Sequence, residues 1–101
     1  MEVATARRYS DGEAVTVHIR TRGHFTHIDD SGDAVARARR LGATDDWLPL
    51  ATSVVEQEGF NVKRSGVVFV SVGRGRDIDE LATRLADCAY AVHTTLLETV
   101  S

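Results

Sequence analysis

The sequence is poor in cysteine, proline and lysine, and it contains no long apolar run. Cys88 is the only cysteine, so the chain cannot close an internal disulfide, which is typical of proteins in a reducing cytosol. The N-terminal stretch MEVATARRYSDGE lacks the apolar core of a signal peptide. No apolar run approaches the roughly 18 residues of a membrane span. The sequence therefore predicts a cytoplasmic protein with no membrane partner.

The composition is that of an ordinary folded domain. The chain has 101 residues, of which 43% are hydrophobic and 27% are charged, and its formal net charge is −3. A chain of this length buries enough surface for one core, so we expect a single domain over residues 1–101.

Two hairpins are predicted from alternation and glycine positions. Residues 13–20 alternate apolar and polar side chains, and Gly23 suits the left-handed position of a three-residue loop before a second strand over residues 24–29. This loop would set Ile19 opposite Phe25, so that Phe25 joins the apolar face. A second hairpin is expected around the turn KRSG, followed by a central strand over residues 67–72, because that strand is apolar on both faces.

Helices are expected in three segments. Asp30 or Ser31 can cap a first helix that ends at Gly42. Its inner stripe would be Ala34, Val35, Ala38 and Leu41. A second helix is expected from residue 45 or 46 to residue 58, and a third from residue 77 onward, where apolar residues repeat at 3.6 spacing. The order ββααββα predicts an α+β fold with a four-stranded, mainly antiparallel sheet packed against helices.

Four stretches of the chain resemble an uncharacterised bacterial domain family that is found in prophages and other mobile elements. They are DGEAVTVHIR, IDDSGDAVARARRLG, EQEGFNVKRSGVVFVSV and LATRLADCAYAV. The resemblance implies a strand pair that ends in Asp-Asp-x-Gly, a helix that ends in Gly, a second hairpin and a helix rich in Leu and Ala. It also implies a phage or mobile-element origin. Because the family has no established activity, the resemblance assigns no catalytic residue.

The segment GRGRD follows a predicted strand and precedes a helix, which is the context of a phosphate-binding loop. Its candidate residues are Gly73, Arg74, Gly75 and Arg76. Neither a third glycine nor a Lys-Ser/Thr pair follows, however, and Asp77 with Glu80 forms a capping box that fills the helix N-terminus. A capped turn is therefore the favoured interpretation, and a phosphate site is the alternative.

Histidines and arginines provide two further candidate sites. His18, His24 and His27 cluster near two aspartates, but they lack a second ligand motif, so we assign no metal site. His93 is expected to be solvated. A basic patch for nucleic acid would consist of Arg20, Arg22, Arg37, Arg39 and Arg40. The acidic net charge and the lack of an aromatic stacking pair weigh against general nucleic-acid binding.

The last helix provides the candidate surface for a protein partner. Some 22 residues span about 33 Å, which is longer than a four-stranded sheet is wide. Its end would leave an apolar stripe uncovered, formed by Val92, Leu96, Leu97 and Val100. The leading hypothesis is therefore a small non-enzymatic module that binds a protein partner or forms a homodimer.

Two alternatives remain open. One is a nucleic-acid-binding accessory domain that uses the arginine patch, and the other is a metal- or phosphate-dependent enzyme. No Ser/His/Asp or Cys/His arrangement is visible in the sequence, so no catalytic residue and no cofactor are assigned.

Overall fold

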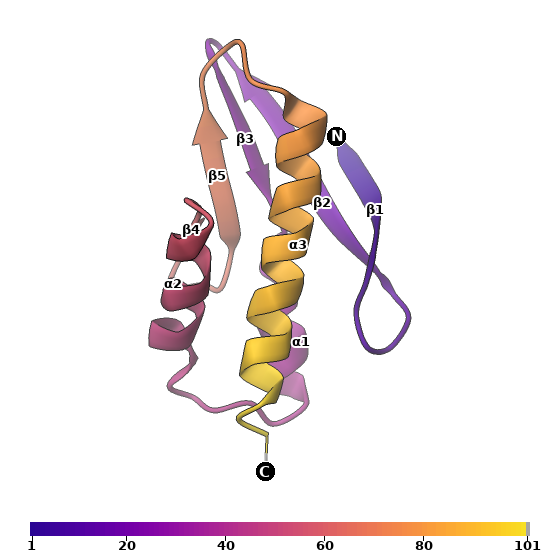
Figure 1. Cartoon of the computed structure of the whole chain (residues 1–101), viewed down its shortest axis with the longest axis vertical. Helices are drawn as coiled ribbons and strands as arrows, with labels where there is room; N and C mark the ends of the chain where they lie inside the picture. The colour runs from indigo at the N-terminus through magenta and orange to yellow at the C-terminus, as the bar shows by residue number, and fades with distance from the viewer. Residues whose placement is uncertain (101) are drawn as a thin grey trace.

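The structure is a computed structural model that describes residues 1–100 of the chain. Within these residues, five strands form one antiparallel sheet (Figure 1): β1 (Glu2–Arg8), β2 (Ala14–Arg22), β3 (Phe25–Asp29), β4 (Asn61–Val62) and β5 (Val68–Val72). The helices are α1 (Asp33–Arg40), α2 (Trp47–Gln57) and α3 (Ile78–Leu97). The strand order is β1-β2-β3-β5-β4, so β5 is an interior strand paired on both of its edges, as predicted. The predicted α+β class is confirmed.

The prediction of four strands is wrong by one, because the N-terminal strand β1 was not expected. Val3 of β1 pairs with Val17 of β2, and only Val3 and Thr5 of this strand are partly buried. The other residues of β1 are Glu, Ala and Arg, which have low strand propensity. The segment therefore lacks the alternating apolar signal of a half-buried strand.

The predicted register of the first hairpin is also wrong. The loop has two residues and begins at Gly23, whose φ of 60° is the left-handed geometry that glycine tolerates. Arg22 therefore pairs with Phe25, and Ile19 pairs with Ile28 instead of with Phe25. Because side chains alternate along a strand, this shift of three positions moves every side chain of β3 to the opposite face.

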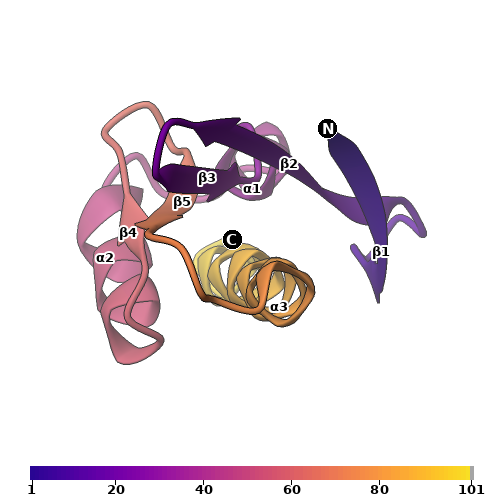
Figure 2. The same cartoon turned by 90° about the horizontal axis from the view of Figure 1, so that it is seen from above.

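Helix α3 lies across one side of the sheet (Figure 2), and its C-terminal half runs beyond the sheet between α1 and α2 (Figure 1). The core lies between α3 and the strands. It contains Val15, Val17, Ile28, Val68 and Val70 from the sheet and Leu81, Leu85, Ala89, Val92 and Leu96 from α3. No helix within residues 1–100 is long and apolar enough to cross a membrane.

A buried carboxylate joins three segments of the chain. Asp30 is only 1% exposed, and it accepts hydrogen bonds from the backbone N–H groups of Gly32 (2.8 Å), Ala34 (3.2 Å) and Val68 (2.9 Å). Burial raises the pKa of Asp30, while these three hydrogen bonds act in the opposite direction. The carboxylate therefore connects the end of β3 to the first turn of α1 and to the start of β5.

Several local predictions can be compared with the structure. The turn of the second hairpin and the cap at Asp77 are confirmed, since Asp77 Oδ1 accepts a hydrogen bond of 3.1 Å from the Glu80 N–H. Cys88 is buried, as expected, and burial raises the pKa of its thiol to about 12. Leu41, placed in the inner stripe of the first helix, is instead 55% exposed.

Replacing Asp30 with Ala should strongly destabilise the fold. The change leaves three buried N–H groups without an acceptor, and each such group costs about 1–3 kcal/mol. We expect a loss of at least about 3 kcal/mol in the free energy of unfolding, measured by urea denaturation. Asp77→Ala, which removes an exposed cap, is the control and should cost about 0.5–2 kcal/mol. A loss for Asp30→Ala no larger than that for Asp77→Ala would contradict the role of this carboxylate.

Candidate functional site

The side of the sheet opposite α3 carries exposed and half-buried side chains in place of a second helical layer (Figure 2). Strand alternation brings together there the side chains that we call the open face: Thr16, His18, Arg20 and Arg22 of β2, Phe25, His27 and Asp29 of β3, and Phe69 and Ser71 of β5. In the predicted register, the β3 side chains of this group would have lain on the other side of the sheet from the β2 side chains. The open face is therefore a consequence of the two-residue hairpin loop.

Three aromatic rings lie on the open face. The rings of His27 and Phe69, on neighbouring strands, stack with their centroids 5.5 Å apart and their planes 26° from parallel. Phe25 lies next in line along β3 and is 64% exposed, the most exposed of the aromatic side chains. The Lys63 ammonium lies 5.2 Å from the centre of the Phe69 ring. The open face thus combines exposed aromatic surface with a cation.

A polar network holds the middle of the open face in place. The Oδ2 atom of Asp29 accepts from Arg20 Nη2 and lies 3.0 Å from His27 Nε2. The other ring nitrogen of His27, Nδ1, lies 3.0 Å from Ser71 Oγ. The Arg20 side chain stays 70% exposed although it is bonded to Asp29. Both nitrogens of His27 are therefore engaged, and its ring is fixed beside Phe69.

The charge of Asp29 depends on these partners. Burial alone raises the pKa of Asp29, but the hydrogen bond from the Ser31 N–H and the neighbouring His27 and Arg20 outweigh it. The pKa is therefore lowered from its ordinary value of 3.8. Asp29 remains a carboxylate at neutral pH and holds Arg20 and His27 in position.

A shallow hollow crosses the open face and the neighbouring end of β2. Its volume is about 830 Å³, and it is lined by Met1, Ile19, Arg20, Thr21, Arg22, Phe25, His27 and Lys63. Three of these residues, Arg20, Arg22 and Lys63, are cations that line the same hollow as the exposed Phe25 ring. The hollow therefore presents positive charge together with an exposed aromatic ring.

The predicted arginine patch does not form as one surface. Arg20 and Arg22 lie on β2 toward the hairpin, while α1, which carries Arg37, Arg39 and Arg40, lies beyond the opposite end of the sheet (Figure 1). Arg37 is held by ion pairs to Asp33 and Asp11 and by the Tyr9 ring, whose centre is 4.7 Å away. Arg37 therefore acts in the packing of α1 and is not free for a phosphate.

The GRGRD segment forms the exposed loop between β5 and α3, at the same end of the sheet as the first hairpin (Figure 1). Its residues Gly73, Arg74, Gly75 and Arg76 are all exposed, and Asp77 occupies the N-terminus of α3. The loop begins next to the end of the hairpin, because Thr26 of β3 pairs with Val72 at this end of the sheet. The loop is thus a neighbour of the open face and not a separate phosphate cradle.

The predicted partner stripe on the last helix is mostly covered. Val92 and Leu96 are completely buried, Leu97 is half-buried, and Val100 is 38% exposed. The helix does extend beyond the sheet, as expected, but α1 and α2 pack against the extension (Figure 1). Val92 and Leu96 are therefore core residues in this fold and cannot contact a partner.

The four histidines lie in three different parts of the fold. His18 and His27 lie on the open face, and His24 lies in the hairpin loop. Within residues 1–100, no three His, Cys, Asp or Glu side chains form a group that could hold a metal ion. His93 is only 1% exposed, which contradicts the prediction that it is solvated. Its Nδ1 lies 3.2 Å from the carbonyl oxygen of Ala34, because α1 covers this side of α3.

Asp29 should contribute to the pH dependence of stability. Its pKa is lower in the folded than in the unfolded chain, so its stabilising effect is present above about pH 4 and is lost as the pH falls through the folded-state pKa. We expect the free energy of unfolding of the parent protein to fall more between pH 5 and about pH 3 than that of Asp29→Asn. Urea unfolding at several pH values measures this, and equal slopes would contradict it.

No protein-family model, curated protein or solved structure matches the chain. The resemblance to the prophage-associated family therefore stays a hypothesis that rests on the sequence motifs alone.

Proposed function

We propose that the protein binds single-stranded nucleic acid on the open face of its sheet. The observation that carries this proposal is the highly exposed Phe25 beside the His27–Phe69 stack, in a hollow that Arg20, Arg22 and Lys63 also line. Of the hypotheses drawn from the sequence, this is the nucleic-acid alternative. It shares Arg20 and Arg22 with the predicted arginine patch, but the three arginines of α1 are replaced by Lys63 and the aromatic rings of the open face.

An aromatic side chain that stays exposed to water forgoes the stability that its burial would give, so an exposed ring is explained best by a ligand that covers it. Burying a Phe side chain is worth about 1.5–3 kcal/mol, so a chain gains stability when such a ring is covered. On the open face, Phe25 is left in water while the other two rings are held on neighbouring strands. A base that stacks on such a ring contributes about 1–3 kcal/mol of binding energy. Base stacking would therefore explain why the rings lie on this side of the sheet.

The cations of the open face fit a phosphate backbone. Arg22 and Lys63 line the hollow together with Phe25 and His27, and Arg20 presents an exposed guanidinium that Asp29 already orients. An oriented guanidinium loses less conformational entropy on binding than a free one. Phosphates can thus contact the cations while the bases stack on the rings between them.

A single strand fits this surface better than a duplex does. Adjacent strands lie about 4.8 Å apart, so β2, β3 and β5 span roughly 10 Å, the width of two or three bases laid side by side. The bases of a duplex are stacked on each other and cannot reach rings on a sheet surface.

Replacing Phe25 with Ala should weaken binding of single-stranded RNA or DNA by about tenfold or more, because one stacked base loses its partner. Fluorescence anisotropy with labelled oligonucleotides of about 10 nucleotides at low salt measures this. The matched control is Leu41→Ala, which removes an exposed apolar side chain from the far end of α1 and should leave the affinity unchanged. Equal affinities of the parent and Phe25→Ala would contradict the proposal.

Salt should weaken the binding moderately. Neutralising three phosphates gives a slope of about −2 in a plot of log affinity against log salt, or about a twentyfold loss between ~50 and ~200 mM. Lys63→Glu and Arg22→Glu should each reduce the affinity and the slope. Arg40→Glu, a charge reversal on α1, is the control and should do neither. If the parent binds no oligonucleotide at low salt, the proposal is wrong.

A further inference from the structure

Strand β1 forms an edge of the sheet, and its outer side is unpaired. Met1 and Ile19 exchange both of their backbone hydrogen bonds, each 2.7 Å long. Because the bonding direction alternates along a strand, the N–H and C=O groups of Glu2 and Ala4 point away from β2. An exposed edge of this length without proline is a template for another strand. The opposite edge strand, β4, has only two residues and offers no comparable template.

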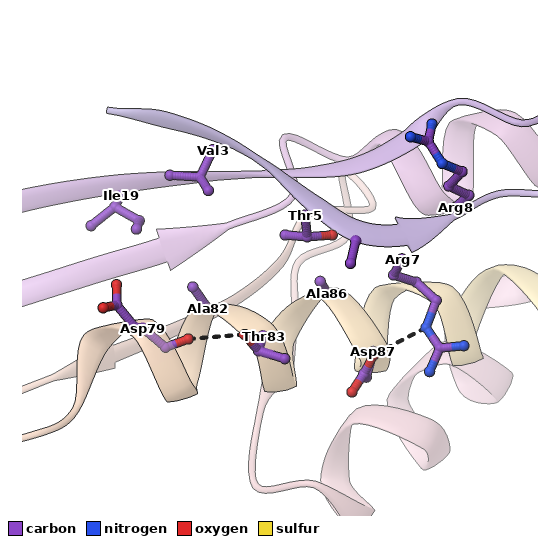
Figure 3. Close-up of a pocket in the computed structure, with 11 residues that line it drawn as sticks. Val3, Thr5, Arg7, Arg8, Ile19, Asp79, Ala82, Thr83, Ala86 and Asp87 are labelled. Atoms are coloured by element: carbon purple, nitrogen blue, oxygen red, sulfur yellow. Dashed lines mark hydrogen bonds and ion pairs between the residues drawn. The ribbon is translucent and has the colours of Figure 1, made fainter.

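The packing of β1 against α3 is incomplete. A hollow of about 510 Å³ separates the two elements (Figure 3), and its floor is formed by small or apolar side chains: Val3, Thr5, Ala6, Ile19, Ala82 and Ala86. An ion pair of 3.0 Å between Arg7 and Asp87 bridges β1 and α3 at one end of the hollow (Figure 3). The side chains of β1 that face α3 are only half-buried. Chain added beside β1 would therefore cover apolar surface as well as pair backbone groups.

We propose that β1 pairs antiparallel with β1 of a second copy, around a two-fold axis at Thr5. In this register Glu2 lies opposite the partner's Arg8, and Ala4 lies opposite the partner's Ala6, while the two Thr5 side chains meet. Opposite charges and Thr pairs directly across two strands are favourable. Within residues 1–100 Glu2 makes no ion pair of its own, and the proposed pairing gives each Glu2 one ion pair, or two in the dimer.

The order of charges along β1 favours this partner over an unrelated strand. The strand begins with an acid and ends with two bases, so it is complementary to itself only when the two copies run antiparallel. A parallel pairing would set like charges opposite each other, which is unfavourable. The two-fold axis is perpendicular to the sheet, so both open faces lie on the same side of one continuous sheet. If the proposed function is correct, the dimer joins two nucleic-acid surfaces.

A charge swap tests the register directly. Glu2→Arg sets Arg opposite Arg, and Arg8→Glu sets Glu opposite Glu, at two places in each dimer. Each single variant should therefore weaken self-association about tenfold, while the double variant should recover it. A mixture of the two single variants should form heterodimers in preference to either homodimer, since every pair is then complementary. Arg40→Glu, away from β1, is the matched control and should not change association.

Sedimentation velocity and native mass spectrometry at low salt measure association, and thermal melting shows that each variant is folded. Recovery in the double variant and an excess of heterodimer support the proposal. A parent protein that stays monomeric up to about 1 mM overturns it, which is the outcome expected if the β-bulge between Ala4 and Arg8 protects the edge. Equal weakening by Arg40→Glu, or a mixture without excess heterodimer, also overturns it. Because the readout is mass, the outcome does not depend on whether nucleic acid binds.

Discussion

Three segments of the chain meet at one carboxylate, that of Asp30. Its hydrogen bonds to Gly32, Ala34 and Val68 fix where β3 ends, where α1 begins and where β5 starts beside β3. Strand β5 follows β3 in the chain only after α1, α2 and β4. The contact between Asp30 and Val68 therefore determines which residues of β3 and β5 pair with each other. The position of every side chain on the open face depends on that alignment. A neutral apolar side chain could not replace Asp30, since it would leave three N–H groups buried without an acceptor.

The residue before Asp30 faces the other way. Strand alternation turns Asp29 toward the open face, where it bonds to Arg20 and His27 at the cost of burying a charge. The arrangement fixes the Arg20 guanidinium and the His27 imidazole in position, so both groups lose less conformational entropy when a ligand binds. Two consecutive aspartates therefore serve different ends. One organises the fold, and the other organises the candidate site.

The elements with strong periodicity could be predicted from sequence, while the relations between elements could not. The last helix, its cap at Asp77 and the central strand β5 follow from local spacing. The strand β1 has almost no apolar pattern, and Gly23 suits a loop of either two or three residues. A three-residue loop places Phe25 on the apolar side of the hairpin, so the prediction did not show that the aromatic rings share the open face. The covering of Leu96 by neighbouring helices depends on tertiary packing, which no local pattern encodes.

The formal net charge of −3 says little about what the open face attracts, because a ligand responds to nearby charges. At the far end of the molecule, Arg37 forms ion pairs with two acids, Asp33 of α1 and Asp11 of the loop between β1 and β2. On the open face the carboxylate of Asp29 is buried beneath its partners, while the Arg20 guanidinium above it stays exposed. With Arg22 and Lys63 also lining the hollow, the outermost charges there are positive. An acidic protein can therefore present a cationic, aromatic surface, provided that its acids are paired elsewhere or lie below the cations they hold.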